Sequence, residues 1–156
     1  MSVFSPNPFL GVEIKDANVT ARRLYKHLIE NEKVDAVIPM THQLMHLDRE
    51  LAQMQLFPLI LGGHEHEVFL ENIGSSTIIK TGSEASKFAT CDITWTSPSQ
   101  TSPNPVEVTL EDAKNFPIDA QLEAVAKNHK SILDELLSTT LFPIDPADHL
   151  SSIDIR

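Results

Sequence analysis

Apolar residues near the start of the chain recur every three or four positions, which is the spacing along one face of a helix. The pattern extends over residues 18–34 and predicts an amphipathic helix. Asp16 or Asn18 is expected to cap its first turn, because either side chain accepts hydrogen bonds from free backbone N–H groups. The apolar face consists of Ala21, Leu24, Tyr25, Leu28 and Ile29.

Shorter apolar runs follow, and their length and β-branched content are typical of strands. Residues 34–41 (VDAVIPMT) are almost continuously apolar, which predicts a strand covered on both faces, and residues 58–63 (PLILGG) predict a second apolar strand. Between them, residues 47–55 predict a short helix. Residues 76–82 and 87–95 predict two more strands, which are expected to form an antiparallel edge. The alternation of helices with strands favours an α/β fold.

The last third of the chain begins with a break in the apolar pattern. Residues 96–105 (TSPSQTSPNP) contain three prolines and no large apolar side chain, so they predict a loop. Residues 106–110 predict a last strand, and a tail over residues 142–156 shows no period. After Pro117 the spacing of a long amphipathic helix returns, carried by Ile118, Leu122, Val125, Ala126, Ile132, Leu133 and Leu136.

The composition is that of a globular protein, with 156 residues, 41% apolar and 22% charged. We expect one domain over residues 1–115, which includes the loop, and then an amphipathic helix and irregular tail over residues 116–156. The net charge of -10 and the pI near 5.0 disfavour nucleic acids and anionic membranes as partners. Neither a secretory signal nor a membrane-spanning segment is predicted, and the sequence does not indicate a compartment. The lone cysteine, Cys91, excludes an internal disulfide framework and is expected to be a buried thiol.

Two of the seven histidines directly follow predicted strands. His42 comes after the strand over residues 34–41, and His64 comes after the second strand. If these strands are parallel neighbours, their carboxyl ends meet where open α/β sheets build binding sites, and the two imidazoles converge. The remaining histidines outside this region fit surface or partly packed positions, namely His27, His129 and His149.

The segment GGHEH at residues 62–66 is the strongest chemical signal. Its glycines are expected to let the backbone turn sharply, so that His64 and His66 point at neighbouring positions. Neutral imidazole is a good ligand for zinc, manganese or iron. Glu65 and Glu67 are expected to contact the ligating histidines or solvent, and not the metal itself. The spacing alone leaves open both a metal site and ordinary alternation along a strand.

A second metal geometry would use His42 and His46, which are four residues apart, together with His64 and His66. It requires a helix that begins by Thr41. The sequence LDRE at residues 47–50 instead favours a start near Asp48, which is expected to act as a cap or first-turn acid and, with less weight, as an acceptor that orients His42.

Three segments together resemble a known family. VDAVIPMTHQLMHLDRELA, LILGGHEHE and STIIKTGSEASKFATCDITW look like the carboxyl-terminal half of a calcineurin-like metallophosphoesterase domain of the 5'-nucleotidase type. The resemblance covers roughly residues 10–95. It implies half of a four-layer α/β/β/α sandwich, with a mixed sheet flanked by helices. The final LSSIDIR is similar to the segment that leads such chains into a carboxyl-terminal nucleotide-recognition domain.

The resemblance also implies a chemistry. Two divalent ions, such as zinc, manganese or iron, would activate a bridging water toward a nucleotide or other phosphate ester. His42 and His64 would bind one ion and His66 the other. No catalytic residue beyond these three metal ligands is assigned to the chain.

The chain departs from the family in one respect. The Asp-x-His, Gly-Asp-x-x-Asp and Gly-Asn-His motifs that complete the metal site do not occur in the 156 residues, and Lys127-Asn128-His129 only imitates the last of them. We therefore expect a fragment of a metal-dependent phosphoester hydrolase that lacks the amino-terminal half of the domain, is inactive alone and has at most partial metal occupancy. Two alternatives are a noncatalytic metal-binding or interaction module derived from that fold, and an unrelated α/β domain.

Overall fold

The computed structural model describes residues 11, 13–100 and 102–140. They belong to two compact units, Met1–Phe116 and Pro117–Arg156. The first unit is a mixed α/β fold with a mixed sheet flanked by helices, so the predicted α/β class is confirmed at this level. The predicted irregular tail over residues 142–156, including His149, lies outside the described residues.

The first helix forms as its apolar period predicts. α1 (Ala17–His27) begins at Asp16, whose carboxylate accepts a hydrogen bond from the Val19 N–H at 2.8 Å. Asp16 and not Asn18 is therefore the cap. The helix continues as a π-helical segment, η1 (Leu28–Glu32), and ends at Lys33 with a φ of 58°.

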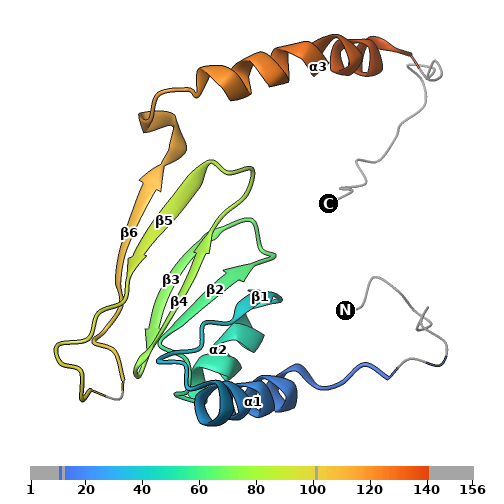
Figure 1. Cartoon of the computed structure of the whole chain (residues 1–156). Helices are drawn as coiled ribbons and strands as arrows, with labels where there is room; N and C mark the ends of the chain where they lie inside the picture. The colour runs from blue at the N-terminus through green and yellow to red at the C-terminus, as the bar shows by residue number, and fades with distance from the viewer. Residues whose placement is uncertain (1–10, 12, 101, 141–156) are drawn as a thin grey trace. The chain divides into compact units, whose positions relative to one another are not determined.

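Four strands form the main sheet in the order β1-β2-β4-β3 (Figure 1). β1 (Met40–His42) pairs in parallel with β2 (Leu59–Gly63), and β2 pairs in parallel with β4 (Ser76–Thr81). β3 (Val68–Ile73) is antiparallel to β4 and forms the other edge. The parallel pairing of β1 with β2 is the arrangement that the sequence-based prediction required for His42 and His64 to lie close together.

The first strand is shorter and more exposed than its apolar sequence predicts. Only Met40 and Thr41 of the predicted strand lie in β1, because Pro39 has no N–H and contributes only its carbonyl, which accepts a hydrogen bond from Leu61 at 3.0 Å. Ile38 is 39% exposed and Met40 is 84% exposed. The prediction of a strand covered on both faces was therefore wrong for this edge.

The predicted antiparallel edge was also wrong. β4 is a central strand, and its antiparallel partner is β3, which the apolar pattern missed and which is joined to β4 by the two-residue turn Gly74-Ser75. β5 (Lys87–Asp92) pairs instead with β6 (Glu107–Asp112) in a separate antiparallel ribbon, with the predicted proline-rich loop between them. Cys91 in β5 is only half-buried, so the expectation of a buried thiol was wrong. This partial burial raises the pKa of the thiol.

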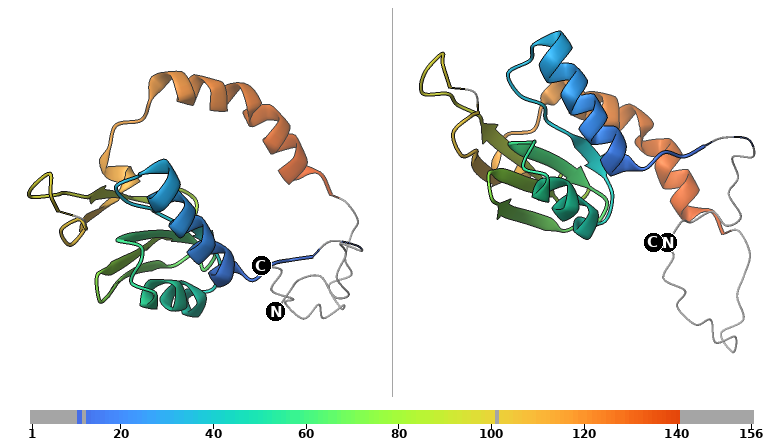
Figure 2. Two further views of the ribbon diagram at one scale, coloured as in Figure 1. Left: turned by 60° about the horizontal axis from the view of Figure 1, so that its bottom comes forward. Right: turned by 90° about the horizontal axis from the view of Figure 1, so that it is seen from below.

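The core lies between the sheet and the two helices of the first unit. Figure 2 shows α2 (Met45–Gln53) along one face of the four-stranded sheet, where Leu51 and Ala52 pack against apolar residues of β2 and β4. Tyr25 of α1 meets Phe57 edge to face, with ring centres 5.6 Å apart. The buried apolar residues are Met45, Leu51, Ala52, Phe57, Leu59, Ile60, Ile78 and Ile79.

An ion pair between α2 and β3 gives the fold a predictable pH dependence. Arg49 donates hydrogen bonds to both carboxylate oxygens of Glu71, at 2.9 and 2.5 Å, and these bonds hold the pKa of Glu71 below its ordinary value of 4.5. The stability from this pair is therefore present above pH 4.5 and is lost as the pH falls through the lowered pKa. We expect Glu71→Gln to flatten the acid side of the unfolding free energy measured by urea denaturation, whereas Glu30→Gln leaves the slope unchanged. Equal slopes for all three proteins would contradict a role for the pair.

The second unit contains one described helix, α3 (Ala120–Ser138), as predicted after Pro117. Asp119 caps it by accepting hydrogen bonds from the N–H groups of Gln121 and Leu122. Its apolar side chains are exposed, with Leu122 at 69% and Leu136 at 68%. Among the described helices, none combines the length and the apolar character needed to cross a membrane.

Candidate metal site

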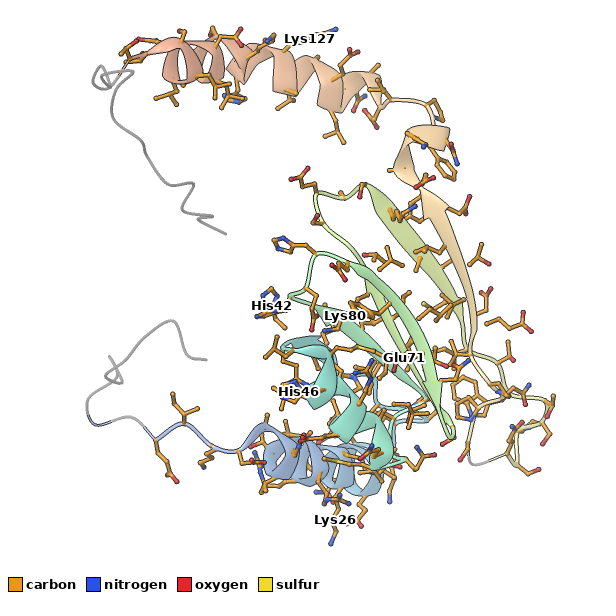
Figure 3. All side chains as sticks on the ribbon, turned by 180° about the vertical axis from the view of Figure 1, so that it is seen from behind. Lys26, His42, His46, Glu71, Lys80 and Lys127 are labelled. Atoms are coloured by element: carbon orange, nitrogen blue, oxygen red, sulfur yellow. The ribbon has the colours of Figure 1, made fainter. Side chains whose placement is uncertain are left out.

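The parallel pairing of β1 with β2 brings two of the candidate ligands together. In the register of the two strands His42 lies opposite Gly63, so the next residue, His64, begins beside the end of β1. The two imidazole rings have centres 5.4 Å apart and planes inclined by 58°. Both side chains are exposed to solvent, and Figure 3 shows His42 near the end of the sheet where Lys80 also lies.

The sharp turn after β2 is made by the histidines and not by the glycines. Gly62 and Gly63 are paired within β2 and have no positive φ, whereas His64 has a φ of 97° and His66 a φ of 58°. The expectation that the glycines make the turn was therefore wrong. A residue with a Cβ rarely adopts such angles, and where it does so the surrounding contacts must hold it there.

The two glycines serve a different purpose, which is to leave space. A Cβ on Gly62 would lie 2.7 Å from Cε of Lys80 and 3.1 Å from Oδ2 of Asp48. A Cβ on Gly63 would lie 3.3 Å from Nδ1 of His42. Gly62 therefore makes room for a buried lysine, and Gly63 makes room for a candidate ligand.

That lysine is the centre of a polar cluster that sequence reasoning missed. The Lys80 side chain is 2% exposed and forms an ion pair with Asp48, which is 0% exposed, with 2.8 Å between Nζ and Oδ2. The ammonium also donates to the backbone oxygens of Gln43 at 2.7 Å and Gly63 at 2.8 Å, and to Glu65 at 2.5 Å. One signal was present, since a lysine within the apolar run of a central strand needs a buried acid as a partner.

Asp48 supports the loop that follows His42. Its Oδ1 accepts hydrogen bonds from Thr41 Oγ1 at 2.7 Å and Gln43 Nε2 at 2.9 Å. Its Oδ2 faces Lys80 at a contact distance but without hydrogen-bond geometry, and has no hydrogen-bond partner among the described residues. Asp48 lies in the first turn of α2 but is not its cap, so the predicted capping role was wrong and the first-turn position is confirmed.

Glu65 links the histidine loop to α2. Its carboxylate accepts hydrogen bonds from Lys80 and from the backbone N–H of Met45, the first residue of α2. Burial alone would raise the pKa of Glu65, but the hydrogen bonds from Lys80 and Met45 outweigh it and lower the pKa. With Asp48 and Glu65 against one lysine, the cluster has a formal charge of -1 and is bound to residues that flank His42 and His64.

The residues present fit a metal ion only in part. Two imidazoles bound to one zinc ion at about 2.0–2.1 Å with tetrahedral angles have ring centres about 5 Å apart, which agrees with the distance between His42 and His64. However, the described residues contain no group of three or more His, Cys, Asp or Glu side chains that could hold an ion, so His66 does not join the other two. His46 lies on α2, which begins at Met45, so the geometry with His42 and His46 on one helical face was wrong.

Comparison of the sequence with models of known protein families and with curated proteins finds no match. What the site can bind therefore follows from its own side chains. Two adjacent, exposed imidazoles whose neighbouring residues bind a cluster with excess negative charge favour a divalent cation of the zinc, manganese or iron type over an anion.

Proposed function

We propose that the chain carries part of the dinuclear metal site of a phosphoester hydrolase that resembles the calcineurin-like metallophosphoesterases of the 5'-nucleotidase type. His42 and His64 would bind one divalent ion, and His66 would bind the second. One observation carries the proposal, namely the two imidazoles side by side at the carboxyl ends of the parallel strands β1 and β2.

The chemistry proposed for the complete site is hydrolysis of a nucleotide or other phosphate ester. Two adjacent divalent ions would lower the pKa of a shared water and neutralise charge on the phosphate. The part of this chain would be to hold one face of that site, to which it contributes the three histidines His42, His64 and His66. The mixed sheet would then form one half of a four-layer α/β/β/α sandwich, and the exposed Met40 and Ile38 at the β1 edge support such an addition.

The remaining ligands must come from outside these 156 residues, because the three further motifs of the family do not occur in them. A second polypeptide segment that carries Asp-x-His, Gly-Asp-x-x-Asp and Gly-Asn-His would close both metal shells. This is why the proposal assigns turnover to the assembled site and only metal binding to the chain.

Metal titration of the purified chain tests the proposal. We expect about one zinc or manganese ion per chain by calorimetry and elemental analysis, with affinity lowered at least tenfold in His42→Asn and His64→Gln, since each removes one of two chain ligands. His27→Asn and His129→Gln remove histidines elsewhere and should bind like the wild type. The chain with metal should hydrolyse neither p-nitrophenyl phosphate nor a nucleoside monophosphate.

Two outcomes would contradict the proposal in different ways. A folded chain, confirmed by circular dichroism, that binds no divalent ion would favour the alternative of a noncatalytic interaction module. Robust phosphatase turnover by the pure chain, lost in His64→Gln, would show instead that the site needs no further segment.

A further inference from the structure

The contacts of Lys80 fall on the residues that flank the two candidate ligands. Gln43, whose carbonyl accepts from the ammonium, directly follows His42, and Gly63, whose carbonyl also accepts from it, directly precedes His64. One ammonium therefore holds the backbone of both loops at positions adjacent to the histidines. An ammonium has three N–H donors, and they match the three acceptors on Gln43, Gly63 and Glu65, while the Asp48 carboxylate lies at ion-pair distance.

Asp48 and Glu65 extend this attachment to the other side of each histidine. Thr41, which directly precedes His42, donates to Asp48, and Glu65, which directly follows His64, accepts from Lys80. Both histidines are therefore flanked on each side by a residue bound to the Lys80–Asp48 pair. The positive φ of His64 persists because its two neighbours are fixed in this way.

We propose that Lys80 is a positioning residue that sets the distance between the His42 and His64 imidazoles. It does so from within the sheet, since it lies on β4, the strand on the far side of β2 from β1. The consequence for metal affinity rests on the proposed function, whereas the positioning itself does not depend on a metal.

The matched comparison uses Lys80→Met and Gly74→Ala. Methionine keeps the length and apolar character of the lysine stem and removes the ammonium. Gly74→Ala is expected to destabilise the β3-β4 pair at the start of β4, whereas Lys80 lies near the end of that strand. The added methyl would lie 2.0 Å from Gln55 Oε1 and far along the strand from the histidines. This variant therefore controls for general loss of stability.

The first readout needs no metal. With ring centres at 5.4 Å, the imidazole protons of His42 and His64 should give a nuclear Overhauser effect in the metal-free wild type and in Gly74→Ala, and should lose it in Lys80→Met. Its persistence in Lys80→Met, its loss in both variants or its absence from the wild type would each overturn the proposal. If Lys80→Met does not fold, the double variant Lys80→Met/Asp48→Asn, which also removes the buried carboxylate, is measured in its place.

The second readout uses Co²⁺, whose visible absorption reports the geometry of its ligands. We expect Lys80→Met to bind Co²⁺ about 10 to 100 times more weakly than the wild type and with an altered spectrum, as for other residues that orient metal ligands. Equal affinity and spectrum in both proteins would overturn the positioning role. A wild type that shows the ring-to-ring signal but binds no Co²⁺ would refute the proposed function and leave the role of Lys80 intact.

Discussion

Gly74→Ala is expected to lower the free energy of unfolding by about 3 to 5 kcal/mol, from the cost of the left-handed conformation and of the hydrogen bonds it displaces. Gly74 has a φ of 59°, which a residue with a Cβ adopts at a cost of about 1–2 kcal/mol. The added Cβ would also lie 2.0 Å from Oε1 of Gln55, so the amide must leave its place.

That amide closes the β3-β4 turn. Gln55 donates to the carbonyls of Ala52 and Ile73 and accepts from the N–H and hydroxyl of Ser75, all between 2.8 and 3.1 Å. Displacing it would break several bonds at once, each with a net value of about 1 kcal/mol. Because the turn joins an edge strand to a central strand, its loss should weaken the whole sheet.

Gly82→Ala is the matched control, measured by urea denaturation under the same conditions. Gly82 has a φ of 88°, but a Cβ there would meet its nearest atoms at 3.6 Å, which is an ordinary contact. It should therefore lose only the conformational term, about 1–2 kcal/mol. Equal losses in the two variants would show that the Gln55 amide adds nothing to the stability of the turn.

Lys80→Met is expected to lower the free energy of unfolding by about 3–5 kcal/mol, because it leaves a carboxylate in the protein interior without its cation. Asp48 is 0% exposed and its Oδ2 has no other partner among the described residues, so water cannot solvate it without opening the fold. Glu65 is less affected, since it is 17% exposed and keeps the N–H of Met45.

The double variant Lys80→Met/Asp48→Asn separates the two causes of this loss. Asparagine has nearly the shape of aspartate, and its oxygen still accepts hydrogen bonds from Thr41 and Gln43, but it carries no charge. We expect it to recover at least half of the lost stability in the same denaturation experiment. If the double variant is no more stable than Lys80→Met, the loss comes from the missing lysine contacts and not from the unpaired carboxylate.

Features set by local periodicity could be predicted from the sequence. The apolar spacing predicted α1 and α3, and Asp16 was one of two caps expected for α1. The apolar runs that end at Thr41 and Gly63 predicted that His42 and His64 converge if the two strands are parallel neighbours, and the structure confirms both the pairing and the adjacency. The assignment of these side chains as metal ligands remains a prediction.

Features set by contacts between distant segments could not be predicted in this way. The start of α2 was misplaced because its acidic partner is Glu65, which is 20 residues further along the chain, and not the local Asp48. The strand β3 was missed because two of its three outward positions, Val68 and Leu70, are apolar, which hides the alternation. A two-residue Gly-Ser turn between β-type runs was the available signal for the hairpin.

The close approach of Gly62 to Lys80 has a consequence for how this sequence can change during evolution. A methyl group at position 62 would occupy the space through which the Lys80 stem passes, 2.7 Å from its Cε. A larger residue at 62 is therefore compatible with the fold only if position 80 becomes shorter, and Asp48 then no longer has a buried cation to pair with. Substitutions at positions 48, 62 and 80 are therefore coupled, so that a change at any one of them favours compensating changes at the other two.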